Sequence, residues 1–495
     1  MLEGLLESLT PLSLLFVLVG VLGGILVGAL PGFTATMGTA LLLPFTFTLA
    51  PEHGLAMLGA LYVASQMADS IPACLVNTPG TPSAMATAWD GFQLTKQGRG
   101  QAAIVASGFS ALVGTAIGGV TFMFLTGPLA NIALRFGPPE FFWVGVFALT
   151  LIGSIAGDSL IKGIAGGLLG LLVGTIGISA TGAVSRYTFG MDELRAGMNV
   201  VAALIGVFAV PQVLNMVAER RQHLTIATYE KHRGVTLATV KEVLTKPVNL
   251  IRSSIIGTVV GILPGAGGPV ATLVAYNEAV RWSTNRKKFG KGALEGVVAS
   301  EAAGNAAAGG AMVPLIALGI PGSAPAAVIL GALLLQGVRP GPTFFASESV
   351  IVYSFAWSII IAGFVTFLIA AVLADSLARM VLIPVRFLAP VVMFLSVIGA
   401  FAIRNNIVDV FLSLTLGVLV YLLWKIGFHP GPIGLGIILG PIVEPALVQA
   451  MALAQGAGLA GVFLRSAVSK GLIALTLVSI AWILLSNQRE GRRAD

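Results

Sequence analysis

Two acidic residues lie inside long apolar stretches of this sequence, Asp69 in "VASQMADSIPACLV" and Glu301 in "VVASEAAGNAAAGG". An ionisable side chain in such a segment is costly and usually serves an ion, a proton or a bound ligand. At an offset of 233 residues Asp69 corresponds to Ala302, one position from Glu301. With Asn305, the two acids are candidate ion-coupling residues. The alternative is a charge at a helix end or an internal polar pair.

Pro-Gly pairs interrupt apolar stretches at four places. The segments 27–34, "VGALPGFT", and 260–267, "VGILPGAG", share five of their first six letters. The segments 77–84, "NTPGTPSA", and 319–326, "GIPGSAPA", each place a small hydroxyl residue after Pro-Gly. Backbone groups freed inside a membrane must be satisfied by protein, water or ligand. Half-helix N-termini suit an anion, and exposed carbonyls suit a cation such as sodium.

Close helix packing or a mild kink would explain an isolated Gly or Pro. Four breaks in matched order favour a binding site instead. The candidate substrate-binding residues flank these breaks: Pro31, Gly32, Thr34, Thr36, Asn77, Thr78, Pro79, Gly80, Thr81, Pro264, Gly265, Gly267, Gly268, Thr272, Pro321, Gly322 and Ser323.

Other chemistries have little support in the residues. The chain has no G-x-x-x-x-G-K-[ST] loop, no G-x-S-x-G and no H-E-x-x-H, so neither ATP use nor hydrolysis is expected. The single cysteine, Cys74, excludes an intramolecular disulfide and a cysteine-based metal cluster. We expect no enzyme activity, no catalytic residues, no cofactor and no metal site other than one for sodium.

The composition is that of a membrane protein. Hydrophobic residues make up 56% of the chain and charged residues 10%, against about 25% charged in ordinary soluble domains. Apolar runs of membrane-spanning length recur without the alternation of barrel strands. They lie at 11–30, 101–130, 138–156, 198–217, 350–374, 406–424 and 471–486. The sequence therefore predicts an all-α polytopic integral membrane protein. The formal charge of +7 is better explained by cytoplasmic loops than by nucleic-acid binding.

Basic segments set the orientation. The stretches 218–247, 281–291 and 487–495 are basic and are expected in the cytoplasm. The apolar segment 252–280 then has cytoplasmic loops on both sides, so it is expected to turn back at its Pro-Gly pair. Its arms of roughly 12–15 residues reach past the middle of a bilayer without crossing it. The corresponding loop of the first half, 48–58, has no Lys or Arg, as in a hairpin entering from the opposite face.

The expected organisation is two inverted-topology repeats, each with a re-entrant hairpin and a broken helix, with roughly 10–12 transmembrane segments in all. In order, these are a first transmembrane repeat over 1–217 (hairpin tip near 31–32, broken helix near 79–80), a basic cytoplasmic linker over 218–247, a second transmembrane repeat with an extra C-terminal helix over 248–486 (tip near 264–265, broken helix near 321–322) and a cytoplasmic tail over 487–495. After the first broken helix we expect helices near 101–134, 138–156, 160–180 and 198–217.

The motifs resemble those of a known family. The stretches on which the resemblance rests are 28–47, "GALPGFTATMGTALLLPFTF", 77–103, 261–283, 289–323 and 337–342, "GVRPGP", with "SRYTFGMDEL" at 185–194. Nearly end to end, the chain resembles the large membrane (permease) subunit of the tripartite tricarboxylate transporters. It departs from the family's usual patterns at "YVASQMADS" and "EAAGNA", next to the candidate site.

The resemblance implies properties that the residues alone do not give. Such subunits act with a small four-helix membrane subunit and a periplasmic solute-binding protein that captures the substrate. They carry out secondary import of carboxylates, with citrate as namesake, across the bacterial inner membrane, driven by a sodium or proton gradient.

Two alternatives from other function classes are a membrane-embedded enzyme acting on lipid-linked substrates and a non-transporting receptor or assembly subunit.

Overall fold

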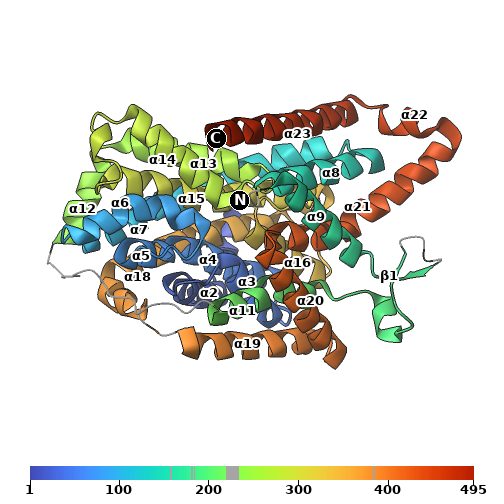
Figure 1. Cartoon of the computed structure of the whole chain (residues 1–495), viewed down its shortest axis with the longest axis horizontal. Coiled ribbons are helices and arrows are strands. Elements are labelled where there is room, and N and C mark those ends of the chain that lie inside the picture. Colours follow the sequence, from blue (N-terminus) through green and yellow to red (C-terminus); the bar gives the residue numbers. More distant parts are fainter. Residues whose placement is uncertain are drawn as a thin grey trace.

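The computed structural model describes residues 1–155, 159–179, 182, 184–218, 234–381, 383 and 385–494, and these are almost entirely helical (Figure 1). Within these residues the only strands are β1 (Gly177–Ile178) and β2 (Ser185–Arg186), which pair antiparallel. Six of the described helical segments are long and apolar enough to cross a membrane: Pro11–Ala29, Gly100–Ala133, Val200–Ala218, Ser349–Leu373, Ile407–Lys425 and Pro430–Gly456. The prediction of an all-α polytopic membrane protein is therefore confirmed.

The first 96 residues form a helical hairpin followed by a broken helix. The elements are α1 (Leu2–Ser8), α2 (Pro11–Ala29), α3 (Ala35–Thr46), α4 (Pro51–Ala68), α5 (Ser70–Val76), η1 (Pro82–Ala84) and α6 (Met85–Lys96). We call residues 30–34, between α2 and α3, the first tip, and residues 77–81, between α5 and η1, the first break. Gly32 has a φ of +87°, a left-handed conformation that glycine adopts without strain, so it permits the sharp turn.

A helical hairpin followed by a broken helix recurs after residue 246. It comprises α13 (Pro247–Ile262), α14 (Gly267–Trp282), η3 (Arg286–Lys288), α15 (Leu294–Leu318) and α16 (Ala324–Leu335). We call residues 263–266 the second tip and 319–323 the second break. The arms α13 and α14 have 16 residues each, about 24 Å at 1.5 Å per residue, so the expected 12–15 residues were too few. The interpretation as inverted membrane repeats stays a prediction.

The remaining helices complete each half. They are α7 (Gly100–Ala133), α8 (Pro138–Ile155), α9 (Leu160–Gly174), η2 (Asp192–Ala196), α10 (Val200–Phe208) and α11 (Val210–Ala218) in the first half, and α17 (Pro342–Ser347), α18 (Ser349–Met380), α19 (Val385–Ala402), α20 (Ile407–Lys425), α21 (Pro430–Ala457), α22 (Leu459–Phe463) and α23 (Ala467–Ala494) in the second. The helix expected over 160–180 was too long, because α9 ends at Gly174 and β1 follows.

Two segments expected to be a linker and a tail contain helix. Within the linker, α12 (Val235–Leu244) packs on α7, and Arg99 pairs with Glu242 at 2.7 Å. Residues 219–233 of the linker lie outside the described residues. The last helix, α23, continues to Ala494, so the expected tail is helical almost to its end.

The helices define two ends of the molecule. In Figure 1, α12 lies at one end and the β1–β2 hairpin at the opposite end, while α19 and α23 run between them along opposite edges. The basic loop after α14 lies at the α12 end, because Gln97 donates to the Lys291 carbonyl at 2.8 Å. The open end of the first hairpin faces the other way, because Gln336, after α16, donates to the carbonyl of Thr46. The two hairpins therefore open toward opposite ends.

Glycine contacts hold α15 at the centre of the molecule. On one side Gly114 and Gly118 of α7 face its backbone, and on the other Gly257 and Gly261 of α13 do so. A Cβ built on any of these glycines would lie 2.1–2.5 Å from a carbonyl oxygen of α15. Small residues at such contacts let helix backbones approach closely in membranes, where dispersion replaces the hydrophobic effect. The helix that carries Glu301 is thus packed between α7 and α13. It contacts α7 at Ala302 and Ala306 and contacts α13 at Ala303 and Ala307.

A buried carboxylate joins the two halves at the α12 end. Asp90 of α6 accepts hydrogen bonds from the Tyr276 hydroxyl at 2.8 Å and from the backbone N–H groups of Gly292 and Ala293 at 2.9 and 2.7 Å. We expect Asp90→Ala to lower the free energy of unfolding by about 3 kcal/mol, because it leaves buried donors unpaired. Denaturant titration of the purified protein in detergent measures this loss.

The matched control for Asp90 is Asp192→Ala. The Asp192 side chain is 91% exposed and pairs only loosely with Arg195 at 3.4 Å, and exposed pairs contribute little. Equal stability of the two variants would contradict a structural role for Asp90.

Candidate functional site

Asp69 and Glu301 are both buried in the interior of the protein, near enough to influence each other. Asp69, between α4 and α5, is 1% exposed, and Glu301, in the middle of α15, is 3% exposed. The two carboxyl groups are close enough to interact electrostatically. Asp69 accepts a hydrogen bond from Thr81, at the first break. Glu301 accepts one from the Thr87 hydroxyl of α6 at 2.5 Å, so side chains of the first half hold an acid of the second.

Two oxygen atoms near these acids have no hydrogen-bond partner among the residues that the structure describes. They are Glu301 Oε2 and Asn305 Oδ1, and both are buried. Asn305 lies one helical turn after Glu301 and donates its side-chain N–H to the Glu301 carbonyl at 3.0 Å. Ser107 lies within hydrogen-bonding reach of the Glu301 carboxyl group, and its hydroxyl is also joined to that of Ser70 at 2.5 Å. Carboxylate and amide oxygens are the ligands of hard cations, and a carboxylate oxygen also accepts a proton. The two unpartnered oxygen atoms can therefore bind a cation, and Glu301 can bind a proton.

A second polar group lies where the second tip meets the first half. A Cβ built on Gly268 would lie 2.6 Å from Ser83 Oγ and 2.9 Å from Gln66 Nε2, so the start of α14 touches both side chains. Tyr62 of α4 and Ser323 of the second break are joined by a hydroxyl hydrogen bond of 3.2 Å. The start of α14, the start of α16 and the face of α4 therefore meet at one place.

The sequence reasoning missed Tyr62, Gln66, Ser83 and Thr87. A signal for the first two was present, because Tyr62 and Gln66 stand seven and three residues before Asp69. That spacing places all three on one face of a helix. Ser83 and Thr87 carried no comparable signal, since their partners are more than 180 residues away in the chain.

The tips and breaks contact one another in pairs. The Gly265 N–H of the second tip donates to the Gly322 carbonyl of the second break at 3.0 Å. A Cβ built on Gly80 of the first break would lie 3.3 Å from the Phe33 carbonyl oxygen of the first tip. Gln212 of α11 donates to the Gly32 carbonyl and satisfies one freed backbone group there. The structure thus brings together the four interrupted segments that the sequence singled out.

The four segments differ in exposure. Pro31 and Gly32 of the first tip are buried, as are Pro321 and Gly322 of the second break. In the second tip Leu263 is exposed, Pro264 and Gly265 are half-buried and Ala266 is buried. Most of the first break is half-buried, and Asn77 is exposed. Asn77 has a left-handed φ of 55° and ends α5, so it serves the break as a helix stop. The half-buried members of the four segments are Thr34, Thr78, Pro79, Gly80, Thr81, Pro264 and Gly265.

Several candidate residues have structural partners of their own. Thr34 caps α3 by accepting from the Met37 N–H at 3.1 Å, and Ser323 caps α16 by accepting from the Ala326 N–H at 3.3 Å. Thr78 donates to the Val76 carbonyl at 3.2 Å, and Thr272 donates to the Pro269 carbonyl at 3.0 Å. Thr36 lies half-buried in the first turn of α3.

The helix N-termini of α14 and η1 have no side-chain cap. Pro269 and Pro82 lack an N–H, so the donors in these first turns are the N–H groups of Gly267, Gly268 and Ser83. Ala266 precedes α14 and offers no acceptor, and Thr81 precedes η1 but donates to Asp69 instead of capping. Uncapped N-termini present partial positive charge and N–H donors, the features that bind anions. None of the contacts described at the tips, the breaks and the buried acids involves a Lys, Arg or His side chain.

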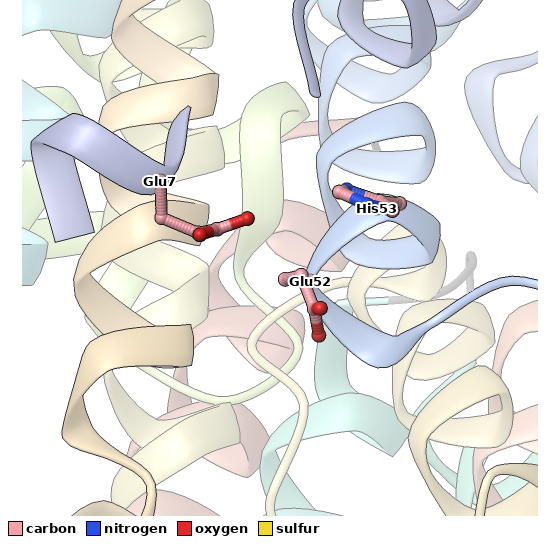
Figure 2. Close-up of side chains that lie close together, drawn as sticks. All are labelled: Glu7, Glu52 and His53. Carbon is pink, nitrogen blue, oxygen red and sulfur yellow. The ribbon is translucent and has the colours of Figure 1, made fainter. Parts of the chain in front are cut away.

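Three other side chains form a group with metal-ligating atoms. Figure 2 shows Glu7 of α1 opposite Glu52 and His53 at the start of α4, with candidate ligand atoms that all lie within 4.8 Å of one another. His53 is held by Ser13, which hydrogen-bonds its Nδ1 at 3.1 Å, and by stacking on Phe16. The group lies about 24 Å along α4 from Asp69, so it is separate from the helix breaks.

Comparison with known proteins gives the family. The model of the tripartite tricarboxylate transporter TctA family matches residues 14–435. The chain is 35% identical over 493 residues to an "uncharacterized 52.8 kDa protein in TAR-I ttuC' 3'region" of Agrobacterium vitis, covering 99% of this chain and 96% of that protein. It is 36% identical over 236 residues to an "uncharacterized protein in TAR-II ttuC' 3'region" of the same organism, covering 48% of this chain and 97% of that protein.

No solved structure matches the chain. The family is one of transporters and not of enzymes. Its model spans the hairpins, the broken helices and the buried acids. The chain is a multi-pass membrane protein that belongs to the TctA family of tripartite tricarboxylate transporters.

Proposed function

We propose that this chain is the large transmembrane subunit of a secondary, ion-gradient-driven importer of a tricarboxylate or related organic acid. The observation that carries the proposal is the interior site, where two uncapped helix N-termini lie near the buried acids Asp69 and Glu301. Glu301 Oε2 and the neighbouring Asn305 Oδ1 are buried there with no hydrogen-bond partner among the described residues. An anion placed at the N-termini is stabilised by N–H donors. The same anion is repelled by Asp69 and Glu301 unless a cation or proton neutralises them.

This repulsion gives a physical reason for coupling. A cation at Glu301 Oε2 and Asn305 Oδ1, or a proton on a carboxyl group, removes the negative charge that opposes substrate binding. The substrate and the ion then bind more tightly together than apart, which is the thermodynamic basis of symport. We propose Na⁺ or H⁺ as the coupling ion, with Asp69, Glu301 and Asn305 as its site.

Charge distribution supports an orientation. The loops at the α12 end carry Lys96, Arg99, Lys246, Arg286, Lys287, Lys288 and Lys291. An excess of Lys and Arg in loops marks the cytoplasmic side, so the α12 end faces the cytoplasm of a bacterial inner membrane and the β1 end faces the periplasm. A periplasmic solute-binding protein then delivers the organic acid at the β1 end, and a small four-helix subunit completes the complex.

Reconstitution tests the proposal. The chain is placed in proteoliposomes with its small subunit and binding protein, and uptake of labelled carboxylates is followed with and without an inward sodium or proton gradient. Gradient-dependent accumulation is expected. Absence of such uptake across a panel of mono-, di- and tricarboxylates would refute the proposal, and binding without uptake would instead favour a receptor or assembly subunit.

Asn305 gives a sharper prediction about the ion. We expect Asn305→Ala to raise the ion concentration for half-maximal uptake about tenfold, because it removes one buried oxygen ligand. Initial uptake rates at several external sodium concentrations and pH values measure the shift. Asn285→Ala, in the exposed loop after α14, is the matched control and should behave as wild type. An unchanged ion dependence in Asn305→Ala would remove that residue from the ion site.

A further inference from the structure

A cavity lined by both polar and apolar side chains lies at the β1 end, away from the helix breaks. It has a volume of about 390 Å³ and is bounded by β2, the start of α10, the last turn of α16 and the middle of α21. We call it the outer cavity and define it by Arg186, Asn199, Leu334, Arg404 and Glu444. Its volume falls within the range of about 300–1,000 Å³ that is usual for small-molecule sites.

Two arginines from distant parts of the chain line this cavity. Arg186 lies on β2, within the familial stretch "SRYTFGMDEL" that the interior site does not use. Arg404 lies in the turn between α19 and α20. A guanidinium group matches the geometry of a carboxylate and binds it through two parallel N–H donors.

The hydrogen bonding of both arginines is incomplete. Arg186 Nη2 pairs with Glu444 Oε1 at 2.7 Å, but its buried Nε has no partner in the described part of the chain. Arg404 is exposed, and its Nη1 reaches the Gly197 carbonyl only at 3.4 Å. Asp409 also attracts Arg404 electrostatically. A buried N–H without an acceptor costs free energy, so an anion that accepts from Arg186 would be stabilised.

The position of the outer cavity relates it to the interior site. The helix α16 begins at the second break beside Ser323, and its final turn borders the cavity. Its 12 residues extend about 18 Å. The two sites therefore lie at the two ends of one helix. The outer cavity is at the β1 end, which faces the periplasm in the proposed orientation.

We propose that the outer cavity is a carboxylate-binding site, where a di- or tricarboxylate is held by Arg186 and Arg404 before it reaches the interior site. This inference rests on the proposed function for its place in transport. It does not depend on that function for the binding itself, because the cavity and its arginines are present whether or not the protein transports.

The first experiment is site-resolved labelling of arginine in the purified full chain. Phenylglyoxal modifies accessible guanidinium groups, and mass spectrometry reports the rate at each residue. We expect citrate to slow modification of Arg404 about tenfold and acetate to slow it much less, because only a polycarboxylate meets both arginines. Arg339, in the loop after α16, does not border the outer cavity and is the internal control. Its rate should stay constant.

Variants separate binding from folding. Arg186→Gln should abolish the protection of Arg404 by citrate, and Arg404→Gln should raise the KM for citrate uptake about tenfold with kcat nearly unchanged. Arg339→Gln should leave both parameters unchanged. A purely structural role for Arg404 would instead lower kcat and the amount of folded protein together.

The outcomes distinguish the two proposals. Equal labelling of Arg404 with and without citrate would overturn the outer site even if the wild type transports. Protection of Arg404 in a protein that shows no gradient-driven uptake would support the outer site and overturn the transport proposal.

Discussion

Replacing Glu301 by glutamine should lower gradient-driven uptake at least about 100-fold while the protein remains folded, because the interior ion site then loses its charge. Glutamine retains the size of the side chain and an oxygen that can accept from Thr87, so the 2.5 Å contact between the two halves can persist. It cannot bind or release a proton, and it offers a cation no net charge. Uptake in proteoliposomes under an imposed gradient measures the loss.

The matched control is Glu295→Gln. Glu295 lies in the first turn of the same helix, where it pairs with Lys246 at the α12 end and takes no part in the buried cluster. Its replacement should change uptake less than about twofold, because a partly exposed ion pair contributes little. Size-exclusion profiles of both variants should match the wild type.

Two results would contradict this role for Glu301. Normal uptake in Glu301→Gln would exclude the residue from coupling and would favour an internal polar pair of structural value only. Loss of folded protein would make the role structural, and Thr87→Ala would then test it, since removing the donor should cause the same instability. A receptor or assembly subunit should tolerate the neutralisation of both Asp69 and Glu301.

Replacing Gly257 by valine should prevent the native packing of α13 on α15 and lower the free energy of unfolding by about 3 kcal/mol or more. A Cβ built on Gly257 would lie 2.1 Å from the Ala303 carbonyl oxygen and 2.6 Å from its Cα. Both are backbone atoms, so no side-chain rotation relieves the overlap and the helices must separate. Thermal unfolding of the purified protein in detergent measures the effect.

Gly471→Val is the matched control for this substitution. Gly471 lies in α23, and no described atom outside its own helix lies within 4 Å of the Cβ that would be added. The control carries the same β-branched side chain in a helix and therefore the same propensity change. Equal unfolding temperatures for the two variants would show that the close approach of α13 and α15 is not required for stability.

These two predictions concern one helix. Gly257 sets how closely α13 approaches α15, and Glu301 and Asn305 lie on α15 two residues before and two after Ala303. A shift of the helix backbone at that point displaces the unpartnered oxygen atoms directly. Small losses of packing there should therefore reduce uptake before they abolish folding.

Local features of the sequence determined the fold class and the positions of the interruptions. Apolar runs of membrane length predict spanning helices by composition alone. A Pro-Gly pair weakens a helix locally, because the missing N–H of proline and the backbone freedom of glycine act within a few residues. A single Pro or Gly is tolerated inside helices of this chain, as Pro314 is in α15 and Gly114 is in α7. The turns and breaks accordingly lie at the Pro-Gly pairs, including Pro31–Gly32 and Pro264–Gly265. Local composition did not reveal the helix α12 in the linker or the continuation of α23. Both lie in polar segments whose basic charge was interpreted as that of a linker and a tail.

The tertiary structure decided which side chains meet at those interruptions. Thr87 and Glu301 are 214 positions apart, and Tyr62 and Ser323 are 261 apart. The pairing of Arg186 with Glu444 likewise joins β2 of the first half to α21 of the second, which are far apart in the chain. No local pattern encodes such partners, because they are set by how closely whole helices pack, and that depends on the glycines of α7 and α13 against α15. The sequence thus determined where the backbone is interrupted, and the packing of the helices decided which polar groups occupy the space that the interruptions create.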